Sequence, residues 1–477
     1  MLIRNARLLD GRAVDVRIAD DNVTAISHHD PASTEDATII EAGGGLLIPG
    51  LHDHHVHVAA TAAALASVPC GPPEVLNRED LVSALYRAAG TGWLRGIGYH
   101  ESVAGDLDRA WIDAVIADRP VRIQHRSGRM WIFNSLGLER LRSATNGASP
   151  TGLDLKSGQL FDEDEWLRSA LGSSPPEFRV VAERWARWGV TGLTDMNPQN
   201  DRAAAGHFAR QQAGGSLPQR IVLAGLPELA SAPAGTHLTI GPVKVHLHEA
   251  RLPDYDALVV LIREAHAQGR KVAVHCVTET ELAFTLAALS DAGAEPGDRI
   301  EHASVAPDAL VAEIALLNLT VVTQPNFVAE RGDTYLAAID QQDWPSLYRL
   351  RAFRKANVTL AGGTDAPFGA ADPWAAMAAA VSRRTRGGLR LSPQEALTPE
   401  EALNLFLADP HDLSRTRNVE VGIAADLCLL TQDWAALREN IGSADVQASF
   451  IGGRLVHLAD PVAVAVERTG RAARPPA

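Results

Sequence analysis

The sequence predicts an α/β protein built on a (β/α)8 TIM barrel. We expect a small β-sandwich domain made from both termini and a large insertion after barrel strand 1. Three observations lead to this fold class. Short β-branched or apolar segments alternate with helical segments through the middle of the chain, strand-like alternation appears at both ends, and one long region between the first two barrel strands breaks the pattern.

Eight segments are expected to form the parallel barrel strands, each followed by a crossover segment. The first precedes His55 and begins with the apolar run at 46–48. The others are the short runs 190–196, 220–224, 243–247, 271–276, 299–303, 320–324 and 358–362. The helix after the fourth strand has the expected signals, because Asp254 is a suitable N-cap and Gly269 a suitable stop. Between them the apolar residues follow helical spacing, at Leu258, Leu261, Ile262 and Ala265.

The two ends of the chain are predicted to share one small β domain. Alternating runs between residues 2 and 26 are separated by turn signals, and the same texture returns between 425 and 456. The expected boundaries are 1–48 and 417–460 for this domain and 49–416 for the barrel domain, with a loose tail at 461–477.

Residues 62–187 are predicted to be an insertion, since they add strand-like pieces at 96–100 and 120–125 and charged helical stretches outside the count of eight. We expect this insertion to roof the active site.

Composition restricts the class of protein. The chain has 477 residues, 46% of them hydrophobic, which suits a globular barrel with an accessory domain. A formal charge of -14 disfavours nucleic acid or an anionic membrane as a partner, leaving a small-molecule substrate. The three cysteines are widely spaced, and the start of the chain lacks signal-peptide features. We therefore expect a cytoplasmic enzyme.

The segment 48–57 carries the strongest chemical signal, because it runs from a strand into four histidines and an aspartate. Strand alternation puts Asp53, His55 and His57 on one face, with His52 and His54 on the other. Two imidazoles in this arrangement can bind one divalent ion, and a nearby carboxylate can orient or join them.

Further metal-type residues lie at the ends of later strands, where barrel chemistry is located. They are Lys244 on the fourth strand, His275 on the fifth, His302 on the sixth and Asp365 just after the eighth. Any one alone would be weak evidence, but the ordered set indicates a metal centre.

These residues make the sequence resemble the metal-dependent amidohydrolase superfamily, and within it amidohydrolase family 3, which includes N-substituted formamide deformylases. The resemblance covers most of the chain, including the segments 49–57, 131–135, 189–191, 243–244, 299–302, 324–325, 364–367, 380–384, 398–403 and 425–427. It implies that His55 and His57 bind one metal and that His275 and His302 bind a second. It further implies that a carboxylated Lys244 bridges the two, and that Asp365 is both a ligand and the catalytic proton-transfer group.

The expected chemistry agrees with these roles. A divalent ion lowers the pKa of its bound water to about 7 and polarises a carbonyl, while Asp365 can move the proton to the leaving nitrogen. Imidazole and carboxylate suit zinc, and also manganese or iron. Lys244 can bridge only as N6-carboxylysine, and the alternative is an ordinary ammonium paired with a carboxylate beside a single ion.

Two departures from the resembled family concern substrate binding. The relatives usually place Asp-Gly a few residues after the lysine, where this chain has His248-Glu249, and a histidine where Arg129 stands. His246 and His248 share the face of Lys244 and are expected to line the pocket, with metal ligation as the alternative. Arg129 is expected to recognise an acidic or polar group on the substrate, and the alternative is a salt bridge within the insertion. Gln324 is a further candidate for substrate contact.

The function that this reading predicts is hydrolysis of a non-peptide C–N bond in an N-substituted amide, formamide or cyclic amide. The alternatives are a mononuclear deaminase of a heterocycle and, with less support, a non-catalytic scaffold. By resemblance, a homodimer is the expected candidate for the oligomeric state.

Overall fold

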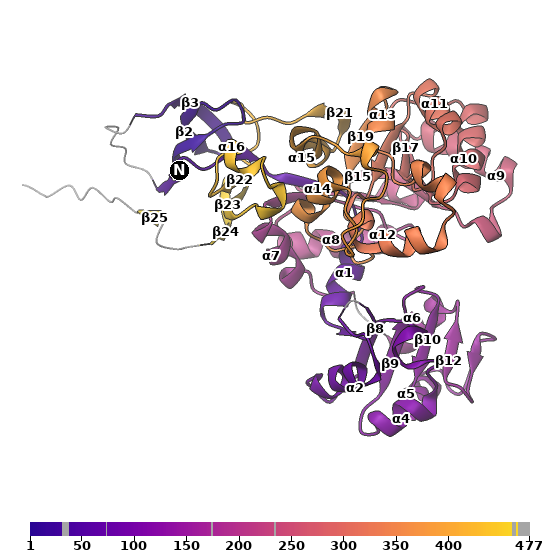
Figure 1. Ribbon diagram of the computed structural model, residues 1–477. Helices are drawn as coiled ribbons and strands as arrows, with labels where there is room; N and C mark the ends of the chain where they lie inside the picture. Colours follow the sequence, from indigo (N-terminus) through magenta and orange to yellow (C-terminus); the bar gives the residue numbers. More distant parts are fainter. Residues whose placement is uncertain (31–37, 73, 173–174, 233–234, 460–463, 466–477) are drawn as a thin grey trace, which may run out of the picture. The chain divides into compact units, whose positions relative to one another are not determined.

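The computed structural model describes residues 1–30, 38–72, 74–172, 175–232, 235–459 and 464–465 (Figure 1). The chain forms two compact units, one of Met1–Val58 with Phe178–Ala477 and the other of Ala59–Glu177. Each is described by itself.

Eight parallel strands form the barrel and confirm the predicted fold class. Their order around the sheet follows the sequence: β6 (Leu51–Val56), β13 (Val190–Asp195), β14 (Arg220–Gly225), β15 (Leu238–His246), β16 (Val272–Cys276), β17 (Arg299–His302), β18 (Thr320–Thr323) and β19 (Thr359–Gly362). Their apolar side chains are almost entirely buried, as expected for strands covered on both faces.

Helices connect most of these strands (Figure 1). They are α7 (Arg179–Arg187), α8 (Arg202–Ala213), α9 (Tyr255–Ala267), α10 (Glu279–Ala292), α11 (Asp308–Leu316), α12 (Asn326–Ala338), α13 (Arg351–Lys355), α14 (Pro373–Ser382) and α15 (Pro399–Leu407). Helix α9 begins and ends as the sequence predicts, because the Asp254 side chain accepts from the amide of Ala257 and Gly269 adopts a left-handed φ of 70°. In the described part of the connection from β14 to β15, the helical element is the short 3-10 turn Pro227–Ser231.

The first predicted barrel strand needs a correction. The apolar run at 46–48 does not lead unbroken into the histidines, because β5 (Leu47–Pro49) pairs with β22 (Leu427–Leu430) in a different sheet. Gly50 separates β5 from the barrel strand β6, and a Cβ atom there would lie 2.1 Å from a side-chain atom of Thr191. The sequence therefore predicted a strand at 46–48 correctly, but assigned it to the barrel sheet instead of the sheet that contains β22.

The terminal segments form two sheets that share one apolar core. One sheet has the order β25-β4-β1-β2-β3 and the other β24-β23-β22-β5. The strands are β1 (Leu2–Arg7), β2 (Ala13–Ala19), β3 (Asn22–His28), β4 (Ile39–Glu41), β22 (Leu427–Leu430), β23 (Val446–Ile451), β24 (Arg454–Leu458) and β25 (Val464–Ala465). Asp426, just before β22, accepts hydrogen bonds from the guanidinium of Arg220 on barrel strand β14, so a half-buried ion pair joins this β region to the barrel. The predicted loose tail lies outside the described residues except for β25, which pairs with β4.

The unit Ala59–Glu177 is built on a six-stranded sheet of order β7-β8-β9-β10-β12-β11. Its strands are β7 (Val68–Pro69), β8 (Leu94–Tyr99), β9 (Val121–His125), β10 (Met130–Phe133), β11 (Leu153–Asp154) and β12 (Gln159–Phe161). One apolar cluster contains residues of α2 (Arg78–Arg87) and α4 (Arg109–Val115), and a second contains residues of α5 (Ser135–Ala144) and α6 (Asp164–Leu171). The predicted insertion ran to residue 187, whereas α7 packs on β13 and β23 and so belongs to the barrel unit.

The first and last barrel strands, β6 and β19, meet through polar contacts just beyond β19. The amide of Asp365 donates to the carbonyl of His55 at 2.8 Å, and the amide of His57 donates to Ala366 at 2.8 Å. Asp53 accepts from the amide and from the hydroxyl of Thr364, at 3.0 and 2.5 Å. A Cβ at Gly363 would lie 2.5 Å from the Cβ of His55, so only glycine lets the two segments approach this closely. This seam places Asp365 beside the histidines of β6.

Candidate active site at the barrel mouth

Three of the predicted ligands, His55, His302 and Asp365, form one compact group. Each offers one ligand atom, and these atoms lie within 4.8 Å of one another. The three residues come from the C-terminal ends of β6, β17 and β19, which the barrel brings together although 310 positions separate the first from the last (365 − 55). Within the part of the chain that the structure describes, this is the group of His, Cys, Asp and Glu whose spacing suits a metal ion.

Asp365 faces both histidines of the first strand. Its Oδ1 lies 3.2 Å from His57 Nε2 and 3.5 Å from His55 Nε2. Burial alone raises the pKa of this carboxyl, but the neighbouring histidines and Lys244 outweigh it, and the pKa lies below its usual value. The group is therefore an ionised carboxylate at neutral pH, as a metal ligand or a proton acceptor must be.

His302 and Asp365 both have left-handed backbones, with φ of 73° and 56°. Such conformations cost energy in non-glycine residues and are concentrated at functional sites. Here they turn the chain sharply at the ends of β17 and β19, so that both side chains point to the same place above the barrel.

The His302 ring lies between two other imidazoles. Its centroid is 4.7 Å from that of His55 and 4.5 Å from that of His275. Its Nδ1 lies 2.6 Å from Gln324 Oε1, so the carbonyl of this buried amide accepts the Nδ1 proton and leaves Nε2 deprotonated. The sequence predicted Gln324 as a substrate contact, and the observed contact of its oxygen is with His302.

Burial lowers the pKa of His55, His275 and His302, keeping these imidazoles neutral. Neutral imidazole is the form that binds metal ions.

Lys244 is the buried cation of the site. Only 6% of its surface is exposed, and its Nζ has no hydrogen-bond partner among the described residues. Burial lowers the pKa of its ammonium to about 8, although Glu301 and Asp365 oppose that shift. An unpartnered amine in such a place is costly unless the group is neutral, modified or bound to something further.

His246 and His248 follow Lys244 but differ in their surroundings. The His246 ring packs on His275 with centroids 4.3 Å apart, in register across β15 and β16. His248 lies beyond the strand, where its Nδ1 accepts from the amide of Ala250 at 3.2 Å. His246 is therefore adjacent to a predicted ligand, while His248 caps a short turn.

The opposite face of β6 has a structural role. His52 Nε2 lies 2.9 Å from the hydroxyl of Thr194, and the His52 and His54 rings pack with centroids 4.6 Å apart.

Asp53 was expected to orient or join the imidazoles, but its carboxylate accepts hydrogen bonds from Thr364 and from the amide of His55 instead.

Glu301 and Arg299 are the site residues that sequence reasoning missed. Glu301 Oε2 accepts from His55 Nδ1 at 2.5 Å, and its carboxylate also holds the guanidinium of Arg299. Both side chains are buried. The sequence does show a glutamate directly before His302, but it does not show that this glutamate contacts His55, which lies 246 positions earlier, on β6.

Arg129 belongs to the insertion unit, where it forms a two-pronged ion pair with Asp162. The distances are 2.7 Å for Nε to Oδ1 and 2.6 Å for Nη2 to Oδ2. This is the salt-bridge alternative weighed above, and contact with a substrate is the rival prediction that the kinetics of an Arg129 variant would decide.

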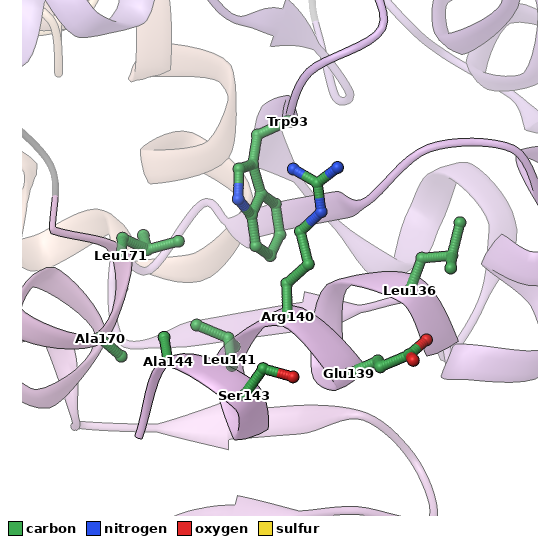
Figure 2. Close-up of a pocket in the computed structure, with 9 residues that line it drawn as sticks. All are labelled: Trp93, Leu136, Glu139, Arg140, Leu141, Ser143, Ala144, Ala170 and Leu171. Carbon is green, nitrogen blue, oxygen red and sulfur yellow. The ribbon is translucent and has the colours of Figure 1, made fainter. Parts of the chain in front are cut away.

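The insertion unit also contains a cavity of about 480 Å³ between α5, α6 and Trp93. Figure 2 shows the guanidinium of Arg140 beside the indole of Trp93 at this cavity. Its lining includes none of the predicted site residues.

Comparisons with known proteins agree with the barrel fold. The model of the Amidohydrolase family matches residues 38–457. The chain belongs to this family. It is 23% identical to N-substituted formamide deformylase of Arthrobacter pascens, over 84% of this chain and 86% of the relative. It is 22% identical to the putative amidohydrolase YtcJ of Bacillus subtilis, over 88% of this chain and 90% of the relative.

A solved structure with the same fold is an uncharacterized metal-dependent hydrolase from Pyrococcus horikoshii. Its TM-score is 0.76 at 21% identity, covering 93% of this chain and 99% of that one. A second, from Pyrococcus furiosus, has a TM-score of 0.71 at 21% identity, covering 91% of this chain and 99% of that one.

Family membership confirms the predicted class: the protein is an amidohydrolase, an enzyme acting on carbon–nitrogen bonds other than peptide bonds. It is a metal-dependent hydrolase, and the group of His55, His302 and Asp365 could hold a metal ion. No helix among the described residues is long and apolar enough to cross a membrane.

The salt bridge of Arg129 yields a testable prediction. We expect Arg129→Ala to leave the KM for acidic and neutral substrates equally unchanged, because Asp162 already occupies two donors of the guanidinium. Steady-state kinetics of this variant beside Asp162→Ala would measure it. A KM that rises for acidic substrates alone would establish Arg129 as a substrate contact.

Proposed function

We propose that this protein hydrolyses a non-peptide C–N bond in an N-substituted amide, a formamide or a cyclic amide. The observation that carries the proposal is the convergence of His55, His302 and Asp365 within 4.8 Å at the mouth of the barrel. The similarity to an N-substituted formamide deformylase over most of both chains supports this substrate class.

Six residues are proposed to hold divalent metal, with zinc the preferred ion. His55 and His57 would form one position, His275 and His302 a second, and Lys244 and Asp365 would complete them. The donor set supports this, because the imidazoles of His55, His275 and His302 are neutral and Asp365 is ionised. A divalent ion bound there would lower the pKa of a water molecule and polarise the substrate carbonyl.

Asp365 is the proposed proton-transfer group. Its Oδ1 lies 3.5 Å from His55 Nε2 and 3.2 Å from His57 Nε2, and these two histidines hold the pKa of the carboxyl below its usual value against the effect of burial. Such a carboxylate can accept the proton of the attacking water and return it to the amine nitrogen as the C–N bond breaks. His57 holds Asp365 in place, and its own backbone is fixed by the hydrogen bond to Ala366.

Lys244 is proposed to be carboxylated. Burial and a pKa of about 8 leave part of the amine neutral at physiological pH, which is the form that adds to CO2 with loss of a proton. The product is an anion, and it would replace an unpartnered buried cation by a metal ligand. The alternative, a plain ammonium beside one ion, belongs with the deaminase hypothesis.

A cytoplasmic location is also proposed, since the three cysteines are buried and unpaired.

The function is tested with a panel of N-substituted formamides, cyclic amides and amino-substituted heterocycles. We expect the zinc-loaded enzyme to release amine from the amides, and Asp365→Asn to lower kcat about 10²- to 10⁴-fold because proton transfer is lost. The exposed Asp118 supplies the control, since Asp118→Asn makes the same chemical change at a residue that is none of the six proposed ligands. Release of ammonia from heterocycles, with amides untouched, would favour the deaminase instead.

Carboxylation of Lys244 is tested by 13C NMR after exchange with 13C-bicarbonate. We expect a carbamate signal in the native protein and its loss in Lys244→Ala. A spectrum of the native protein without that signal would make Lys244 an ordinary ammonium.

A further inference from the structure

We propose that Arg299 and Glu301 form a positioning pair that fixes the His55 imidazole in the tautomer that can bind metal, and that Gln324 does the same for His302. The inference rests on the proposed metal centre and deepens it. Neither Arg299 nor Glu301 is one of the six proposed ligands.

The first step concerns the tautomer of His55. Glu301 Oε2 lies 2.5 Å from His55 Nδ1, and an ionised carboxylate can only accept a hydrogen bond. Nδ1 therefore carries the proton and Nε2 presents its lone pair. It is Nε2 that lies 3.5 Å from Asp365 Oδ1, on the side of the proposed metal. A carboxylate behind a histidine in this way both orients the ring and strengthens it as a ligand.

The second step concerns how the carboxylate itself is held. Arg299 Nε pairs with Glu301 Oε1, and Arg299 Nη2 donates to Oε2 at 3.2 Å. The same Nη2 donates to the backbone carbonyl of His54 at 2.8 Å. One guanidinium thus fixes Glu301 and the backbone one residue before His55. The planar fork of arginine suits this double contact, which a lysine ammonium cannot reproduce.

Arg299 and Glu301 form a buried ion pair, not a surface one. Glu301 has 0% of its surface exposed and Arg299 has 5%. A buried carboxylate requires compensation, and here the guanidinium supplies the charge while His55 supplies a further donor. The contacts of Glu301 with His55 and of Arg299 with His54 also join β17 to β6.

His302 repeats the arrangement with a neutral partner. Its Nδ1 lies 2.6 Å from Gln324 Oε1, and the Gln324 Nε2 group has no hydrogen-bond partner among the described residues. Both imidazoles therefore present Nε2, but the His55 position is backed by a carboxylate and the His302 position by an amide. We infer that His55 is the stronger ligand and that its position binds zinc more tightly.

The decisive variant is Glu301→Gln. An amide nitrogen in place of one carboxylate oxygen faces either His55 Nδ1 or Arg299, and the side chain carries no charge, so His55 loses either its acceptor or the anion behind it. We expect the zinc dissociation constant, measured by competition with a chromophoric chelator, to rise about 10- to 100-fold. Arg299→Lys, which keeps the charge and loses the fork, should weaken zinc binding in the same direction.

Glu281→Gln is the matched control. Glu281 is also a buried glutamate, but its carboxylate accepts from the amides of Glu249, Val277 and Thr278 at the start of α10. It should lower the midpoint of chemical unfolding of the metal-free protein and leave the zinc dissociation constant unchanged. A variant that loses stability but keeps its zinc affinity would show that the effect of Glu301→Gln on zinc binding is not a general effect of lower stability.

The outcomes distinguish this inference from the proposed function. Wild-type zinc affinity in Glu301→Gln, in a protein that binds zinc, would overturn the positioning role and leave the metal centre standing. A wild-type protein that binds no zinc would overturn the metal centre itself. Gln324→Glu provides the reciprocal test, since a carboxylate behind His302 should tighten the weaker position, and an unchanged affinity would contradict the inferred difference.

Discussion

The closure of the barrel between its first and last strands is the constraint on which the site depends. Asp53 on β6 holds the amide and hydroxyl of Thr364, and the next residue along the chain is Asp365. A buried carboxylate with these donors fixes the register of the two segments, because a shift of one residue would leave it without partners. The absence of a side chain at Gly363 allows the close approach. Asp365 meets His55 and His57 only because this seam is closed.

Around that seam the site is built in two layers with different tasks. The inner layer includes the neutral imidazoles of His55, His275 and His302, the ionised carboxylate of Asp365 and the buried Lys244, each on a different strand or just beyond it. The outer layer consists of Asp53, Glu301 and Gln324, whose oxygens hold the backbone or the Nδ1 protons of the inner layer. The inner residues decide which chemistry is available, and the outer ones decide which lone pairs point at it.

The inner layer could be predicted from the sequence because it depends on local pattern. Short apolar runs mark the strands, and a histidine, lysine or aspartate directly after such a run lies at the C-terminal edge of a parallel barrel. The outer layer could not, because it depends on pairs far apart in the chain. Glu301 and His55 lie on different strands, 246 positions apart, and Asp53 and Thr364 are 311 apart. The run at 46–48 was placed in the wrong sheet for the same reason, since its alternation does not reveal that β22 is its neighbour.

Binding of divalent metal at the mouth of this barrel is tested most directly by the metal content per chain. It is measured by elemental mass spectrometry on protein expressed with zinc and bicarbonate and never exposed to a chelator. We expect two ions per chain, held by the histidines, Lys244 and Asp365. A single ion would contradict the bridging lysine and favour a mononuclear deaminase. Protein purified in this way with no bound metal would contradict the proposed metal centre.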